Sequence, residues 1–183
     1  MCALDLPIAI NLPYDHCYAS HSSPDPSSEW LHLTRSSLTA VLGRSLRFFA
    51  PGVGFMRLGY CNYTSLDPNP HTIAAIVTKE FLEYTKSRGN DLITPRLEHG
   101  FWGLTEGCRW CVGIQRWLEA FNAKEKFGDA VVPRYVSVGG DSDARVVLEA
   151  TALQTLNEVR MEDLEKFSVE DGPLTELFPF SSR

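Results

Sequence analysis

The segment from Thr78 to Phe121 constrains the fold most, because it predicts two helices joined by a long loop. The first helix carries signals at both ends. Thr78 can act as the N-cap, and Glu80 lies in the first turn, where the helix dipole favours a carboxylate. Arg88 lies in the last turn, and Gly89 follows where a left-handed residue is needed. We therefore predict a helix that begins after Thr78 and ends before Gly89.

A stripe of large apolar side chains predicts the second helix. Trp110, Ile114, Trp117, Leu118 and Phe121 recur at helical spacing and would form one continuous face. Because an aromatic stripe at this spacing is normally buried, we expect Trp110 and Trp117 to be core residues rather than ligand contacts.

Composition and charge exclude several classes of protein. The chain has 183 residues, of which 44% are hydrophobic, enough for one domain with a core. Its net charge of −6 and lack of a basic cluster argue against a nucleic-acid-binding protein, because phosphate neutralisation supplies most of that affinity. No segment approaches the roughly 20 apolar residues of a membrane span. The apolar start, 1–13, lacks basic residues and is interrupted by prolines, so we expect a cytoplasmic location.

The chain divides into three parts by composition. Residues 21–28 (HSSPDPSS) have the composition of a linker, so 1–38 form an N-terminal extension. Residues 39–169 form a single domain, and 170–183 form an acidic C-terminal tail.

The remaining elements predict an α+β fold. The apolar run 71–77 (HTIAAIV) is typical of a buried strand, and residues 134–138 and 145–150 indicate two more strands. The turn-forming residues 139–143 (GGDSD) would join these two as a hairpin. We expect a small mixed or antiparallel sheet with the two main helices packed on one side of it and a long aromatic loop between them.

The central segment carries a series of unusual residues in a characteristic order. These are Gly89, Asn90, Asp91, Leu92, Thr94, Pro95, Arg96, Glu98, Gly100, Phe101, Gly103, Leu104, Gly107, Arg109, Trp110, Cys111, Arg116, Trp117, Glu119 and Ala120. With these residues the chain resembles a mainly bacterial family known only as domain of unknown function 2237. The likeness extends back to 41–43 (VLG) and forward to 147–151 (VLEAT). The resemblance implies a small α+β fold and no assigned activity.

The pair Cys108 and Cys111 forms a CxxC motif at the expected start of the second helix. A thiol there would be stabilised as thiolate by the helix dipole and by Arg109, as a dithiol redox site requires. The alternative is structural, because the resemblance implies Asp, an ordinary N-cap residue, at the position of Cys108. Cys111 would then be a core residue.

Metal binding is a second hypothesis. Cys61, Cys108 and Cys111 with His71 or His99 contain the donors that zinc prefers. We nevertheless expect no stoichiometric zinc and no cofactor, because the cysteines that the resemblance implies are absent. The residues found at those positions are Phe49, Tyr60, Ala74 and Gly113.

A cysteine nucleophile is a third hypothesis, with Cys61 or Cys111 activated by His71. The chain carries no recognised local signature for it. Ala152 also stands where the resemblance implies a histidine, so a mechanism that needs that histidine cannot operate.

The loop from Gly89 to Gly107 is the fourth candidate, because loops of this length in a compact domain are usually functional. If it returns to a helix N-terminus, Arg96 and Arg109 could bind a small anion there. The alternative is that Arg96 pairs with Asp91 or Glu98 and only fixes the loop. The residues assigned to this site are Arg96, Arg109, Asn90, Asp91 and Glu98.

These observations favour a non-catalytic binding or accessory-subunit domain with a small-anion pocket at the loop. A protein partner would bind through the N-terminal extension or the inserted hairpin. The alternative is a thiol-dependent redox protein or enzyme that uses Cys108 and Cys111.

Overall fold

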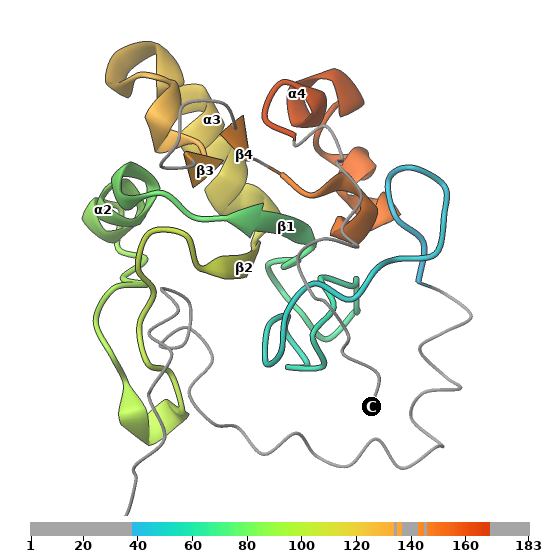
Figure 1. Cartoon of the computed structure of the whole chain (residues 1–183), viewed down its shortest axis with the longest axis horizontal. Coiled ribbons are helices and arrows are strands. Elements are labelled where there is room, and N and C mark those ends of the chain that lie inside the picture. The colour runs from blue at the N-terminus through green and yellow to red at the C-terminus, as the bar shows by residue number, and fades with distance from the viewer. Residues whose placement is uncertain (1–37, 134, 137–142, 145, 169–183) are drawn as a thin grey trace, which may run out of the picture.

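The structure is a computed structural model, and it describes residues 38–133, 135–136, 143–144 and 146–168. In these residues an antiparallel sheet of β1 (Ile73–Ile76) and β2 (Arg109–Val112) lies between helical elements (Figure 1). The helices are α2 (Lys79–Ser87), α3 (Ile114–Phe127) and α4 (Met161–Glu165). The fold is therefore α+β, as the sequence predicts.

The first predicted helix is confirmed at both ends. The hydroxyl of Thr78 accepts a hydrogen bond from the Phe81 backbone N–H at 3.0 Å, which makes Thr78 the N-cap of α2. Gly89 follows the helix with φ of +84°, the left-handed conformation expected after a helix C-terminus.

The second predicted helix begins later than the apolar stripe indicates, and this prediction was wrong over residues 109–112. Those residues form β2, which pairs with β1 in the register Ile73 to Val112 and Ile76 to Arg109. Gly113 is the N-cap, and α3 starts at Ile114. Cys108 is consequently not a helix cap, and Trp110 does not belong to the helical stripe.

The two faces of the sheet bury different parts of the chain. Because side chains alternate along a strand, Ile73 and Ala75 share one face, where they pack with buried residues of α2 and α3 such as Trp117. The opposite face carries Ala74 and Cys111 in a smaller core cluster. Both main helices thus pack on one side of the sheet, as expected. The other members of the smaller cluster are Phe49, Ala50, Val53, Cys61 and Ala150.

A short segment near the C-terminal end of the domain completes the sheet beside β1. Val146 forms an antiparallel bridge with Ala75, and the Val147 N–H donates to the Ala74 carbonyl at 2.8 Å. Thr151 is buried and accepts a hydrogen bond from the Ala74 N–H. Three 3₁₀ helices lie nearby in sequence: η3 (Asp129–Val131), η4 (Leu148–Ala150) and η5 (Leu153–Asn157).

The predicted hairpin is present as a short antiparallel pair, β3 (Tyr135–Val136) with β4 (Asp143–Ala144). Its second strand ends before the predicted range of 145–150, most of which forms the bridge at Val146 and η4. Most of the predicted turn at 139–143 lies outside the described residues.

The loop between α2 and β2 extends away from the sheet, with the 3₁₀ helix η2 (Leu97–His99) at its tip (Figure 1). Gly103 has φ of +79° and lies directly against the carbonyl of Ile93, which only a residue without a Cβ allows. Of the helices in the described residues, none is long and apolar enough to cross a membrane.

Candidate functional site

A pocket of about 160 Å³ lies where the start of the long loop meets β2 and the first turn of α3. Its wall combines one cation, one imidazole and two side-chain amides with apolar side chains, and no carboxylate is among the lining residues. The residues that line it are Asn69, His71, Asn90, Leu92, Trp110, Val112, Gly113 and Arg116.

Asp67 fixes the orientation of His71 in this pocket. The Asp67 side chain is 2% exposed, and its Oδ2 lies 2.8 Å from His71 Nδ1. The same carboxylate accepts the backbone N–H groups of Asn69 at 3.1 Å and His71 at 2.8 Å. Because an ionised carboxylate can only accept, His71 Nδ1 carries the proton of this bond. In the neutral imidazole, Nε2 is then a hydrogen-bond acceptor.

Asn69 packs on Gly113, and this contact needs a glycine. A Cβ on Gly113 would lie 2.9 Å from Asn69 Nδ2, closer than side chains normally approach. The Asn69 Oδ1 atom is buried and has no hydrogen-bond partner among the described residues. A buried unpaired acceptor costs about 1–3 kcal/mol, so Asn69 is held here at a cost in stability.

Arg116 belongs to a charge network with an excess of one positive charge. Its Nη1 lies 3.0 Å from Glu119 Oε2, while Arg88 Nε lies 2.8 Å from Glu119 Oε1. Burial alone would raise the pKa of Glu119, but hydrogen bonds and charge from Arg88 and Arg116 outweigh it and lower that pKa. One carboxylate therefore faces two guanidinium groups.

Trp110 forms an aromatic wall of the pocket and is half-buried rather than a core residue. Its ring contacts Phe101 edge to face, with centroids 5.7 Å apart. The Arg57 guanidinium lies 5.1 Å from the Trp110 ring centroid, in cation–π geometry. Arg57 has φ of +58°, the left-handed region that non-glycine residues rarely adopt.

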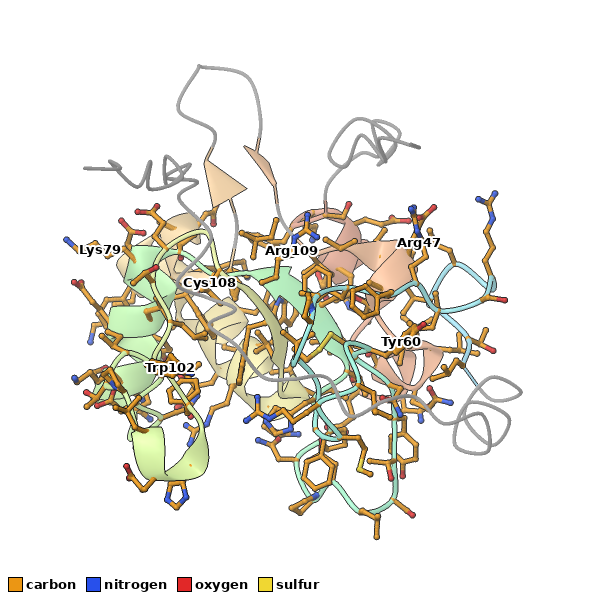
Figure 2. All side chains as sticks on the ribbon, turned by 60° about the horizontal axis from the view of Figure 1, so that its bottom comes forward. Arg47, Tyr60, Lys79, Trp102, Cys108 and Arg109 are labelled. Atoms are coloured by element: carbon orange, nitrogen blue, oxygen red, sulfur yellow. A yellow bond between two sulfur atoms is a disulfide. The ribbon has the colours of Figure 1, made fainter. Side chains whose placement is uncertain are left out.

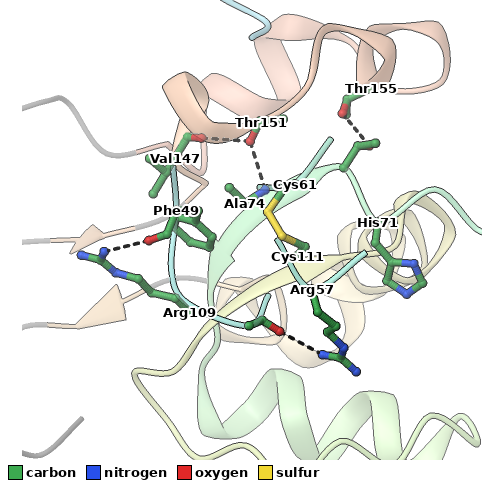
Figure 3. Close-up of a disulfide and its surroundings, with 12 residues drawn as sticks. Phe49, Arg57, Cys61, His71, Ala74, Arg109, Cys111, Val147, Thr151 and Thr155 are labelled. Atoms are coloured by element: carbon green, nitrogen blue, oxygen red, sulfur yellow. Dashed lines mark hydrogen bonds between the residues drawn. A yellow bond between two sulfur atoms is a disulfide. The ribbon is translucent and has the colours of Figure 1, made fainter. Parts of the chain in front are cut away.

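The residues that the sequence assigns to an anion site at the loop have different surroundings. Arg96 and Glu98 are exposed at the tip of the loop. Arg109 instead donates to the Phe49 carbonyl at 3.1 Å, as Figure 3 shows. The Gly107 N–H is also occupied, because it donates to the Val77 carbonyl.

The other two residues of that assignment lie nearer the base of the loop. Asn90 lines the pocket and donates its side-chain N–H to the Thr85 hydroxyl at 2.9 Å. Asp91 accepts from Ile93 and Thr94 and pairs with Lys86 at 3.1 Å. The backbone N–H of Thr94, followed by its hydroxyl, holds the pKa of Asp91 well below its usual range. Asp91 thus fixes the loop.

The cysteines pair differently from the CxxC hypothesis. Cys111 forms a disulfide with Cys61, with their Cα atoms 5.2 Å apart (Figure 3). Cys108 is disulfide-bonded as well and is buried (labelled in Figure 2). In this form neither Cys61 nor Cys111 is a thiol that His71 could activate.

No group of three or more His, Cys, Asp or Glu side chains within the described residues is placed to hold a metal ion. His99 lies at the exposed tip of the loop, 4.0 Å from Glu98. His71 and Asn90 are the two predicted candidates that line the pocket, beside other polar groups. The sequence singles out neither Asn69 nor Arg116 as a site residue, because they meet only through the pairing of β2 with β1.

Comparison with known proteins identifies the family. Residues 39–168 match the profile of the family described as "Uncharacterized protein conserved in bacteria (DUF2237)", and the chain belongs to it. The resemblance found in the sequence is thereby confirmed. No functionally curated protein matches this sequence.

Proposed function

We propose that this protein is a small-ligand-binding domain whose pocket beside β2 binds a small anion. This site replaces the loop-end position expected from the sequence, and it keeps only Asn90 of the residues assigned there. The observation that carries the proposal is Arg116, a cation in a pocket wall that contains no carboxylate.

The charge network supports an anionic ligand. Glu119 can neutralise only one of its two arginines, so the group of three carries one net positive charge beside the pocket. The recorded bonds of Arg116 use Nη1, which leaves other guanidinium N–H donors for a ligand. A guanidinium with free donors suits a carboxylate or phosphate, which it can bind through two parallel hydrogen bonds.

The test is a titration at constant ionic strength with inorganic phosphate and acetate, followed by thermal shift. Arg116→Gln should abolish the anion-dependent shift. Arg160→Gln is the matched control, because it also removes an arginine from a salt bridge but lies outside the Glu119 network and does not line the pocket. The proposal fails if the parent protein shows no anion-dependent shift, or if both variants lose it equally.

The alternative is a redox role for Cys108 and Cys111. The Cys61–Cys111 disulfide favours neither this role nor ligand binding. No contact in the described residues brings the sulfurs of Cys108 and Cys111 together, since Cys111 is paired with Cys61. The redox role stays a hypothesis beside the anion-binding proposal. The accessory-subunit role and its protein partner stay predictions.

The cytoplasmic location also stays a prediction. Disulfides are uncommon in a reducing cytosol. Trapping the thiols of the protein in intact cells before lysis would show whether the Cys61–Cys111 bond exists in its native compartment.

A further inference from the structure

Cys108 does not line the pocket, and its bonding state concerns a different part of the chain. We infer that a disulfide from Cys108 to Cys2 or Cys17 holds the N-terminal extension on the domain. This crosslink is independent of the proposed anion-binding function. It joins the family domain, residues 39–168, to a segment that the family match does not cover.

The number of cysteines identifies the partner of Cys108. The chain has five cysteines, and Cys108 is disulfide-bonded. Because a sulfur atom takes part in only one disulfide, Cys61 and Cys111, which are bonded to each other, are excluded as partners. The two cysteines that remain are Cys2 and Cys17, and both belong to the N-terminal extension.

Hydrogen bonds fix the backbone around Cys108, so the anchor point is a defined part of the domain. The Val77 N–H donates to the Cys108 carbonyl at 2.9 Å, and the Gly107 N–H donates to the Val77 carbonyl at 2.9 Å. The Cys108 N–H donates to the Thr105 carbonyl at 3.1 Å. Cys108 therefore lies beside the residue that follows β1 and directly before β2, rather than at the tip of the long loop.

The extension is long enough to reach this anchor. It enters the described residues at Leu38, whose carbonyl accepts a hydrogen bond from the Leu46 N–H at 3.1 Å. Cys17 lies 21 positions before Leu38. An extended chain covers about 3.3 Å per residue, so this segment can span roughly 70 Å. A domain of about 130 residues has a radius of gyration near 14 Å, so Cys17 and the more distant Cys2 can both reach Cys108.

The chemistry of the crosslink is thiol–disulfide exchange. The thiols of Cys108 and its partner lose two protons and two electrons as the S–S bond forms. A low-molecular-weight disulfide such as oxidised glutathione accepts them and leaves as two thiols, through a mixed disulfide. The exchange is reversible, so a reductant releases the extension from Cys108. The crosslink is thus a redox-sensitive strap between the extension and the domain.

Counting reactive thiols tests the strap on the full chain. The protein is equilibrated in an oxidising glutathione buffer, unfolded without reductant and alkylated with N-ethylmaleimide. Two disulfides among five cysteines leave one reactive thiol per chain, which should lie on Cys2 or Cys17. Three reactive thiols, with Cys108 among them, would overturn the inference.

Non-reducing peptide mapping then identifies the bond. Cleavage at arginine separates Cys108 from Cys111, and cleavage before aspartate separates Cys2 from Cys17. The peptide of Cys108 should be linked to the peptide of Cys2 or Cys17 from the same chain, with the protein a monomer on a non-reducing gel. A link from Cys108 to Cys61 or Cys111, or to a second copy of the chain, would contradict the strap.

The double variant Cys2→Ser/Cys17→Ser is the matched control. It retains the cysteines of the Cys61–Cys111 bond, so its single reactive thiol should lie on Cys108. A protease site inserted into the linker 21–28 lies between both extension cysteines and the domain. After cleavage, the chain without the serine substitutions should remain one band on a denaturing gel until reductant is added, whereas the double variant should separate at once. Separation of both without reductant would show that no strap exists.

Discussion

Removal of the Cys61–Cys111 disulfide tests the central packing of this fold. The bond joins the irregular segment before β1 to the middle of β2, and both sulfurs lie in the smaller core cluster with Cys61 0% and Cys111 1% exposed. The perturbation is the double variant Cys61→Ala/Cys111→Ala. It is preferable to a reductant, which would also act on the disulfide of Cys108.

The magnitude follows from the length of chain that the bond closes. The two cysteines are 50 residues apart in sequence. Releasing a loop of this length increases the entropy of the unfolded chain by an amount worth about 4 kcal/mol at 25 °C in the chain-entropy model. For a protein of 183 residues this corresponds to a fall in Tm of roughly 8–16 °C.

The assay is urea unfolding followed by tryptophan fluorescence under non-reducing conditions, with parent and double variant measured side by side. A shift in the midpoint at constant m value reports the change in stability. Non-reducing peptide mapping of the parent should show the peptides of Cys61 and Cys111 linked. A double variant within about 1 kcal/mol of the parent would refute the argument that this bond constrains the unfolded chain.

Four further predictions concern the core, the loop and the domain boundary. Trp117 is fully buried, so Trp117→Ala should lower the free energy of unfolding by about 3–5 kcal/mol, measured by urea unfolding. Trp117→Phe should cost much less, because the Trp117 indole N–H has no hydrogen-bond partner among the described residues and none is lost. Asp91→Asn should be less stable than the parent at neutral pH. Because the folded-state pKa of Asp91 is lowered, this difference should shrink as pH falls below about 4, near the unfolded pKa. Gly103→Ala should destabilise the protein far more than Gly89→Ala. Both glycines have a positive φ, but only a Cβ at position 103 would meet a carbonyl oxygen, that of Ile93, at 2.2 Å. Thermal melts of the two variants measure the difference. Deletion of 1–38 should leave a cooperative melt, since the buried members of the core clusters in the described residues begin at Ala40 and only the partly buried Leu38 is lost from their edge. A non-cooperative melt would contradict the proposed boundary.

Local signals were sufficient where one residue decides the structure by itself. Thr78 caps α2 through its own hydroxyl, and Gly89 ends that helix because glycine adopts a positive φ easily. The apolar run before Thr78 predicts β1 from local sequence as well, because a short continuous apolar segment is typical of a buried strand. Each of these interactions joins residues that are near in sequence.

Trp110 was wrongly assigned to the second helix because its spacing from Ile114 fits both a continuous helix and a strand followed by a helix. Trp110 and Ile114 are separated by a helical spacing, but a residue on a strand followed by a helix produces the same spacing by coincidence. What decides the state of 109–112 is pairing with β1, which lies across the whole loop in sequence. Tertiary contacts override local propensity in such a segment.

The pocket was hidden from sequence reasoning for a related reason. His71 was a candidate only as the base for a cysteine, whereas the structure turns its imidazole to Asp67 and joins both candidate cysteines in a disulfide. Arg116 lies within the second helix that the sequence predicts, and no motif marks it as a site residue. It becomes a pocket residue because α3 starts at Ile114, two residues after β2 ends, so its first turn faces the base of the loop. The start of this helix therefore decides that Arg116, and not Arg109, lines the pocket.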